Sequence, residues 1–286
     1  MGSFGTLLTA IVTPFDDQLN VNEEAFVAML RHLADHGSDG VVVCGSTGEA
    51  ATLDDDEHVA LVELAARERP RPDFTIVAGA GSNDTSHAVH LTERVTAAGA
   101  DGVLSVTPYY VKPTPRGLHG HYEAIAKSTD LPILLYNIPS RTALDIPNEL
   151  LAELGARNDN IVGVKQANNE ALAPIEGIEV YAGNDDIFAA TMDMGGAGVI
   201  SVAAHLVGDE MRRMIDEPDE RAAINDQLID LFEALFAVTN PILLKAALNL
   251  LGHEVGGLRL PLVSADEEET AGIRQALERH GLLATA

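Results

Sequence analysis

The chain alternates short apolar runs with longer amphipathic stretches. Eight runs are rich in Val and Ile, and most of them lack the alternation expected of a strand with one face in water. Continuous apolar strands are typical of parallel sheets that are covered on both faces. The predicted strands are Leu7–Val12, Gly40–Cys44, Phe74–Ala78, Gly102–Val106, Ile133–Tyr136, Ile161–Val164, Ile178–Ala182 and Gly198–Val202.

Between these runs, apolar positions recur with the spacing of helices. Clear examples are Glu23–His36, Asp55–Arg67, Ser86–Ala97 and Leu118–Ser128. Two of them follow helix start signals, namely the Asp-rich turn after Thr52 and the segment Asn83-Asp84-Thr85. Eight β/α alternations without a break in composition predict a closed (β/α)8 barrel, the TIM-barrel fold of the α/β class. A doubly wound sheet is the structural alternative.

Three further helical segments follow the last predicted strand, and closure of a barrel does not require them. They are Glu217–Ala237, Pro241–Leu251 and Ala265–Leu283. We therefore predict two parts, a catalytic barrel over residues 1–216 and a helical C-terminal extension over residues 217–286.

Composition narrows the partners and the compartment. The chain has 44 acidic and 18 basic side chains, a formal net charge of −26, which disfavours nucleic acid and anionic lipid as partners. Its single cysteine, Cys44, excludes an intrachain disulfide and favours a reducing compartment. The first ten residues lack the basic region of a secretory signal, and no run reaches the roughly 18 apolar residues of a membrane span. We expect a cytoplasmic protein without a membrane partner.

Reactive side chains follow the predicted strands at one end of the barrel. In barrels of this kind, the active site lies at the carboxyl ends of the strands. The segments at that end are Gly45–Glu49, Thr107–Tyr110, Tyr136–Thr142, Lys165 and Gly183–Asp186, whereas the opposite ends carry ordinary turn residues. The sequence therefore predicts a site at the carboxyl end.

Lys165 is the sharpest candidate within that site. The other three lysines lie in a Pro-rich loop (Lys112) or in predicted helices (Lys127 and Lys245), whereas Lys165 directly follows the apolar strand Ile161–Val164. Burial at a barrel mouth lowers the pKa of an amine, and a neutral amine can attack a carbonyl carbon. The alternative is a structural lysine that pairs with a carboxylate across the barrel.

Three other segments can support such chemistry. Tyr136 ends a strand and can relay protons, or it can simply fill the top of the barrel. Ser46 and Thr47 lie in a Gly-flanked turn that can hold a carboxylate, or that merely caps a helix. Arg141 can bind a substrate carboxylate in bidentate fashion, or it can form a surface ion pair.

Other kinds of site lack their motifs. The chain contains no H-E-x-x-H, paired-Cys, P-loop or G-x-S-x-G pattern, so we predict neither a metal nor a nucleotide. Cys44 has no neighbouring His motif and is interpreted as a buried structural thiol. A rival to the hypothesis of a lysine that attacks a carbonyl carbon is a barrel that only binds a phosphorylated ligand, without forming a Schiff base. Its glycine-rich candidate, Gly195–Gly198, precedes the last strand and thus lies at the wrong end.

Three motifs at three strand ends together resemble the dihydrodipicolinate synthase / N-acetylneuraminate lyase family of class I pyruvate aldolases. They are Gly45-Ser46-Thr47-Gly48-Glu49, Tyr136-Asn137-Ile138-Pro139 and Gly163-Val164-Lys165. The resemblance extends from Leu7 nearly to the C-terminus. Ser140-Arg141-Thr142 and Thr107-Pro108-Tyr109-Tyr110 favour the dihydrodipicolinate synthase branch.

The resemblance implies a (β/α)8-barrel lyase that needs no cofactor. It implies that Lys165 forms an imine with pyruvate and that Tyr136, Thr47 and Tyr110 form a proton relay, with Tyr110 supplied by the adjacent subunit. The family usually forms a homotetramer built from two dimers. Substrate binding is implied for Ser46 and Thr47 (pyruvate carboxylate), Gly183 and Ile200 (pyruvate pocket) and Arg141 (the carboxylate of L-aspartate 4-semialdehyde).

Some positions depart from the pattern of this branch. Ser46 replaces a frequent Thr, Val111 a frequent Asn and Ala143 a frequent Gly. In the cleft where L-lysine binds to feedback-sensitive members, Asp55 and His87 differ from the sensitive pattern. Sister aldolases that act on 2-keto-3-deoxygluconate or sialic acid are the nearest rivals, and Arg141 disfavours both because their aldehydes lack a matching carboxylate.

Overall fold

The eight predicted strands form one closed parallel barrel. The computed structural model describes residues 2–284, in which β1 pairs with both β2 and β8. The strands are β1 (Leu7–Ala10), β2 (Gly40–Val43), β3 (Thr75–Gly79), β4 (Gly102–Val106), β5 (Ile133–Asn137), β6 (Ile161–Gln166), β7 (Glu179–Ala182) and β8 (Gly198–Ser201). The predicted barrel is confirmed, and the doubly wound alternative is wrong.

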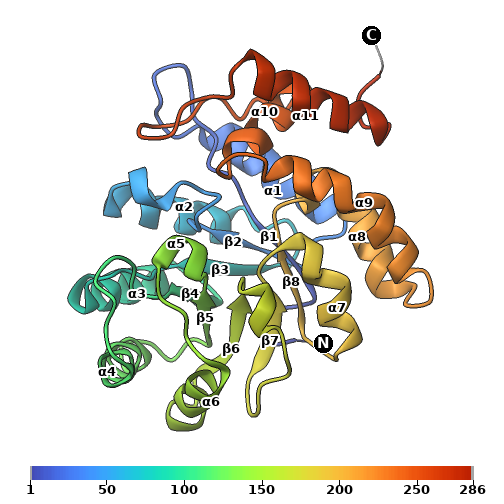
Figure 1. Ribbon diagram of the computed structural model, residues 1–286. Helices are drawn as coiled ribbons and strands as arrows, with labels where there is room; N and C mark the ends of the chain where they lie inside the picture. The colour runs from blue at the N-terminus through green and yellow to red at the C-terminus, as the bar shows by residue number, and fades with distance from the viewer. Residues whose placement is uncertain (1, 285–286) are drawn as a thin grey trace.

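Helices surround the barrel and cover its apolar outer face (Figure 1). They are α1 (Glu23–Asp35), α2 (Asp55–Arg67), α3 (Thr85–Ala97), α4 (Pro115–Ala126), α5 (Pro139–Thr142), α6 (Asn148–Arg157), α7 (Phe188–Asp193) and α8 (Ala204–Asp216). Their starts follow local chemistry. Asp54 caps α2 in a capping box with Glu57, and Asp84 caps α3 as the sequence indicates. None of the helices within residues 2–284 combines the length and the apolar character needed to cross a bilayer.

The interior of the barrel is a second, separate core. Its buried members include Leu8, Val42, Leu104 and Ile200, which point inward from four strands. At the amino ends of the strands, the ring of Phe4 closes the barrel; a Cβ on Gly102 would lie 2.2 Å from that ring, so only glycine fits there. The barrel is therefore packed below the site rather than open from end to end.

The chain continues into three helices, α9 (Arg221–Leu235), α10 (Ile242–Leu250) and α11 (Glu267–Arg279). Figure 1 draws them in orange and red above the barrel. They contact one another, and α9 also packs against α8 and against the short turn Asp185–Ile187 (η3) that follows β7. The extension therefore adjoins the carboxyl end of the barrel, where the predicted site lies.

A buried ion pair ties this extension to the loop after β2. Lys245 on α10 lies 2.6 Å from Glu49, and the two side chains are 1% and 0% exposed. The Lys245 amine also donates to the carbonyl of Gly257 at 2.7 Å and lies 4.2 Å from the centre of the Phe15 ring. Glu49 has a φ of 55°, in the left-handed region that residues other than glycine seldom adopt. The ion pair is therefore made by a residue with a strained backbone.

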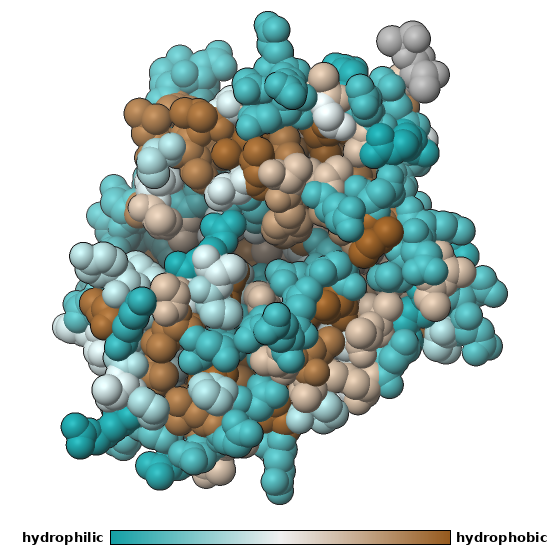
Figure 2. Space-filling model, viewed as in Figure 1, coloured by the Kyte–Doolittle hydropathy of each residue, from teal (hydrophilic) through white to brown (hydrophobic). Residues whose placement is uncertain are grey.

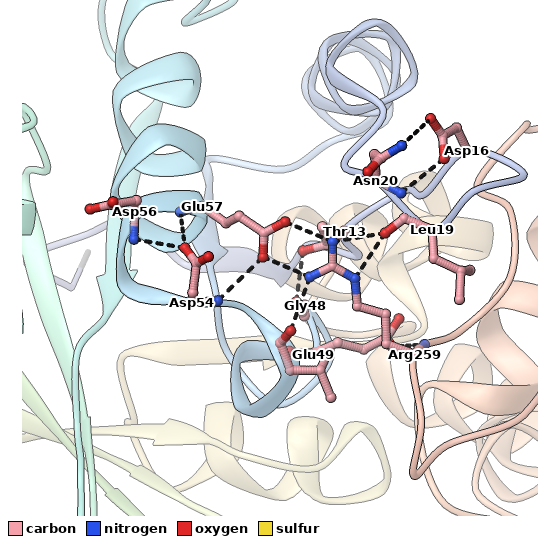
Figure 3. A network of polar contacts seen from close by, with 11 residues as sticks. Thr13, Asp16, Leu19, Asn20, Gly48, Glu49, Asp54, Asp56, Glu57 and Arg259 are labelled. Carbon is pink, nitrogen blue, oxygen red and sulfur yellow. Dashed lines mark hydrogen bonds and ion pairs between the residues drawn. The ribbon is translucent and has the colours of Figure 1, made fainter.

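Arg259 adds a second connection between the same segments (Figure 3). Its guanidinium binds both carboxylate oxygens of Glu57 at 2.6 and 2.7 Å and donates to the carbonyls of Leu19 and Thr52. Its backbone N–H donates to Glu49 at 3.1 Å. The loop after β2 is thus held from above by two residues of the C-terminal extension.

The buried pair generates a stability prediction. Replacing Lys245 by Met leaves the Glu49 carboxylate buried without its counter-charge, so we expect a loss of about 3–5 kcal/mol in the free energy of unfolding. Urea titration followed by circular dichroism measures this loss. The double variant Glu49→Gln/Lys245→Met should recover most of it. As a control, Lys127→Met breaks an exposed pair with Glu123 and should change stability little. Equal effects of the two single lysine variants would contradict the prediction.

Candidate active site

Lys165 lies where the sequence predicts, at the carboxyl end of β6. It is opposite Tyr136 on β5 and Tyr181 on β7 in the parallel register. Its side chain is 5% exposed, and the amine nitrogen lies 4.5 Å from the centre of the Tyr136 ring. The amine therefore sits inside the barrel mouth against a phenol from the neighbouring strand.

Burial controls the charge of this amine. It lowers the pKa of Lys165 from 10.5 to about 8, and the positive charge of Arg141 acts in the same direction. The negative charge of Asp185 raises this pKa through space without a hydrogen bond. Within residues 2–284, Lys165 forms no ion pair, so the interpretation as a directly paired structural lysine is wrong. A larger fraction of this amine than of an ordinary lysine is therefore neutral near pH 7, and a neutral amine can attack a carbonyl carbon.

Tyr136 is the buried phenol next to this amine. Burial raises the pKa of Tyr136 to about 12, although the charge of Arg141 and a hydrogen bond with Ser46 act to lower it. The phenol therefore keeps its proton at neutral pH, and it can exchange that proton with a neighbouring hydroxyl. Both roles of a relay, donor and acceptor, are available to it.

The turn that carries Ser46 and Thr47 lies at the same end of the barrel, where Ser46 is half-buried. Its shape depends on a left-handed residue at Cys44 with a φ of 54°, and the Thr13 hydroxyl donates to the Gly48 carbonyl at 2.7 Å. Thr47 is buried, and its hydroxyl accepts a hydrogen bond from the side-chain amide of Asn240 at 2.9 Å. Of the two hydroxyls of this turn, that of Ser46 is hydrogen-bonded to the phenol of Tyr136.

Arg141 lies on α5, a four-residue helix that the sequence did not predict. Its guanidinium is exposed and donates to the backbone carbonyl of Asn240 at 3.2 Å. Its charge lowers the pKa of both Lys165 and Tyr136. Ala143 ends the helix with a φ of 55°, a conformation that glycine adopts more easily. Arg141 is therefore a cation at the rim of the pocket, able to meet an anionic substrate.

Gly183 directly follows β7, and Ile200 lies within β8. The Gly183 N–H donates to the Gln166 carbonyl at 2.7 Å, and a Cβ on Gly183 would lie 2.7 Å from that oxygen. No side chain fits there, so the backbone after β7 can approach a small ligand closely. Ile200 is fully buried and shares the interior core with Tyr136.

Tyr110 is the candidate that this chain does not bring to the others. It is 87% exposed with a φ of 71°, and among residues 2–284 it forms no hydrogen bond. Its neighbours Tyr109 and Val111 are exposed as well. The single chain therefore leaves an aromatic loop on its surface.

Two residues of the site carry no assignment from the sequence. Asp185 is fully buried and accepts hydrogen bonds from Ser201, from the backbone of Val202 at 3.2 Å and from that of Ala203 at 3.0 Å. The location of barrel active sites at the carboxyl ends of the strands identifies the segment that contains Asp185 but not the role of this residue. Asn240 lies in the extension, outside the barrel, where no sequence signal marks it. No cluster of three or more His, Cys, Asp or Glu residues suited to a metal ion occurs within residues 2–284.

Asp55 and His87, which depart from the pattern of the L-lysine cleft, lie next to each other. The His87 ring is hydrogen-bonded to Asp55 at 3.0 Å and to Ser82 at 3.1 Å. His58, another residue of this cleft, is buried, and its ring is hydrogen-bonded to the Gly79 carbonyl at 2.6 Å. The side chains of Asp55 and His87 therefore form a hydrogen bond with each other.

Comparison with known proteins agrees with this geometry. Residues 3–280 match the model of the dihydrodipicolinate synthetase family. The chain belongs to this family. The resemblance drawn from the three strand-end motifs is therefore confirmed.

Relatives and solved structures from this family cover nearly the whole chain. A protein from Heliobacterium modesticaldum named 4-hydroxy-tetrahydrodipicolinate synthase is 43% identical, with 98% of this chain and 96% of that protein covered. One with the same name from Synechococcus sp. (strain WH7803) is 44% identical, with 96% and 94% covered. The crystal structure of dihydrodipicolinate synthase from Cyanidioschyzon merolae with lysine bound superposes with a TM-score of 0.94 at 39% identity, covering 99% of this chain and 100% of that one.

The lowered pKa of Lys165 predicts a pH profile. Since only a neutral amine can attack a carbonyl carbon, the rate of imine formation with added pyruvate should rise with pH and level off above a midpoint near 8. For a lysine with the ordinary pKa of 10.5, the rate would still be rising at pH 10.5. Timed trapping with pyruvate and cyanoborohydride, read by intact mass, measures the profile.

A variant tests the electrostatic cause of that midpoint. Asp185→Asn removes the negative charge that raises the pKa of Lys165, so the midpoint should move to lower pH. A midpoint near 10.5 in the unaltered protein would show that the amine is not buried in solution.

Proposed function

We propose that the chain acts as a 4-hydroxy-tetrahydrodipicolinate synthase, a Schiff-base-forming lyase of lysine and diaminopimelate biosynthesis. Its substrates are pyruvate and L-aspartate 4-semialdehyde. The observation that carries the proposal is the buried, unpaired amine of Lys165 beside the Tyr136 phenol. The names of its relatives support the same assignment.

The first stage forms an imine. The neutral Lys165 amine attacks C2 of pyruvate, and the resulting carbinolamine loses water to give a protonated imine. A phenol held at a pKa of about 12 can pass protons to and from the oxygen that leaves. Thr47 and Tyr110 complete the relay, which leads protons from the pocket to solvent.

The second stage joins the two substrates. The protonated imine withdraws electrons from the pyruvate methyl group, which loses a proton and becomes an enamine. The enamine carbon attacks the aldehyde carbon of the second substrate, and the aldehyde oxygen takes up a proton to become a hydroxyl. The amino group of that substrate then displaces Lys165 and closes a six-membered ring. Since the lysine itself supplies the electron sink, the reaction needs no cofactor.

The pocket matches the two carboxylates. The hydroxyl and backbone groups of Ser46 and Thr47 hold the pyruvate carboxylate, and Gly183 and Ile200 limit the space around its methyl group. Arg141 binds the carboxylate of L-aspartate 4-semialdehyde from the rim. The exposed Arg141 and the more deeply placed Ser46 and Thr47 suit a reaction in which pyruvate enters first.

We propose that the active protein is a cytoplasmic homotetramer, a dimer of dimers in which Tyr110 reaches the site of the neighbouring subunit. The exposed Tyr109–Val111 loop supports this assembly, because isolated monomers rarely leave adjacent large apolar side chains in water. Figure 2 shows further hydrophobic side chains gathered at the upper left, over the loop that precedes α11 in Figure 1. Exposed residues of that loop include Leu260 and Val263.

Trapping tests the covalent step. Pyruvate with borohydride should add the mass of reduced pyruvate to the peptide that contains Lys165. Lys165→Ala should abolish the adduct and turnover, whereas Tyr136→Phe should lower kcat by about 10²–10⁴-fold, the usual contribution of a proton relay. Lys127→Met serves as the control, since it removes an exposed lysine outside the site. An unmodified Lys165 peptide under turnover conditions would overturn the mechanism.

Acceptor assays test the branch. We expect turnover with L-aspartate 4-semialdehyde and little with the sugar aldehydes used by the sister lyases. Arg141→Ala should raise KM for the semialdehyde by about 10- to 150-fold, because a hydrogen-bonded charge pair contributes about 1.5–3 kcal/mol. KM for pyruvate should stay near its original value. A preference for sugar aldehydes would assign the chain to a sister activity.

A further inference from the structure

Asn240 lies outside the barrel but contacts two residues of the site. It precedes α10 and is 4% exposed. Its side-chain amide donates to the Thr47 hydroxyl at 2.9 Å, and its backbone carbonyl accepts from Arg141 at 3.2 Å. Its side-chain oxygen is buried and has no hydrogen-bond partner among residues 2–284. A purely structural Asn usually has both ends of its amide satisfied, so this one is unusual.

The direction of the bond to Thr47 has a chemical consequence. A hydroxyl has one proton to donate and two lone pairs that accept. When Asn240 donates to Thr47, it occupies one lone pair, and the hydroxyl proton has to point elsewhere. The proton thus stays available for donation to another group, whereas a partner that accepted from Thr47 would occupy that proton.

The extension holds Asn240 in register with the turn. Lys245, one helical turn further along α10, forms the buried ion pair with Glu49, two residues after Thr47. The backbone N–H of Lys245 donates to the carbonyl of Pro241 at 2.9 Å, so the hydrogen bonds of the helix begin at the residue after Asn240. Two residues of one short segment therefore contact the same turn, and neither can shift without the other.

We propose that Asn240 is a positioning residue, which sets the direction of the Thr47 hydroxyl and thereby the direction of the proton relay. The inference rests on the proposed function, because it assumes a relay through Thr47. Its consequence is that the barrel alone does not form a competent site: one orienting group comes from the C-terminal extension. Only the side chain takes part, since the contact to Arg141 uses the backbone.

A double-mutant cycle separates this role from a structural one. Asn240→Ala should lower kcat by about 10- to 100-fold, part of the usual contribution of a proton relay, with KM for both substrates within about threefold of the original value. In the Thr47→Val background, which keeps the shape but lacks the hydroxyl, the same Asn240 substitution should lower kcat by less than about twofold. Asn240→Asp, of nearly the same size but without the donor, should behave like Asn240→Ala. Asn240→Asp takes the place of Asn240→Ala in the test if the alanine variant does not fold.

Asn249 provides the matched control in the same extension. Its side chain bonds to Gly256 at 3.0 Å and to Val255 at 3.1 Å, away from the site, so Asn249→Ala should leave kcat unchanged. Equal losses of kcat from Asn240→Ala in both backgrounds, or no loss at all, would overturn the inference. If the unaltered protein does not trap pyruvate on Lys165, the proposed function fails instead.

Discussion

The proposed chemistry of this protein depends on keeping one amine, that of Lys165, out of water. An ammonium group loses favourable hydration when it is buried, and the neutral form is favoured as a result. The barrel provides this environment because β5 and β6 bring Tyr136 and Lys165 side by side at its carboxyl end. The rest of the site, a rim cation and a hydroxyl-bearing turn, is useful only around an amine in that state.

The chain contains two buried lysines, and their neighbours separate their roles. Burial lowers the pKa of both Lys165 and Lys245 to about 8. Lys245 has the Glu49 carboxylate at 2.6 Å and a backbone acceptor, so its charge is compensated and its position fixed. Lys165 has only the through-space effect of Asp185. A shifted pKa alone would not have distinguished the nucleophile from the structural lysine; the contacts do.

Much of the fold was predictable because burial leaves a direct trace in sequence. Strands covered on both faces read as continuous apolar runs, and a lysine that interrupts this pattern at a strand end, as Lys165 does, stands out. The division of the chain after residue 216 stays a prediction. Contacts between distant segments leave no such trace: the bond from Asn240 to Thr47 joins residues 193 positions apart, and α5 is too short to show a period. The proposed position of Tyr110 involves a second subunit, and a single chain does not contain that contact.

The closed floor of the barrel limits how the reaction can proceed. Phe4 and Tyr181 pack beneath the site, and the interior below Lys165 is filled with side chains. Everything that enters or leaves therefore passes through a single opening. The water released when the imine forms has to escape by the path that the aldehyde uses to arrive. A shared path favours an ordered reaction, in which imine formation with pyruvate is complete before the aldehyde enters the pocket.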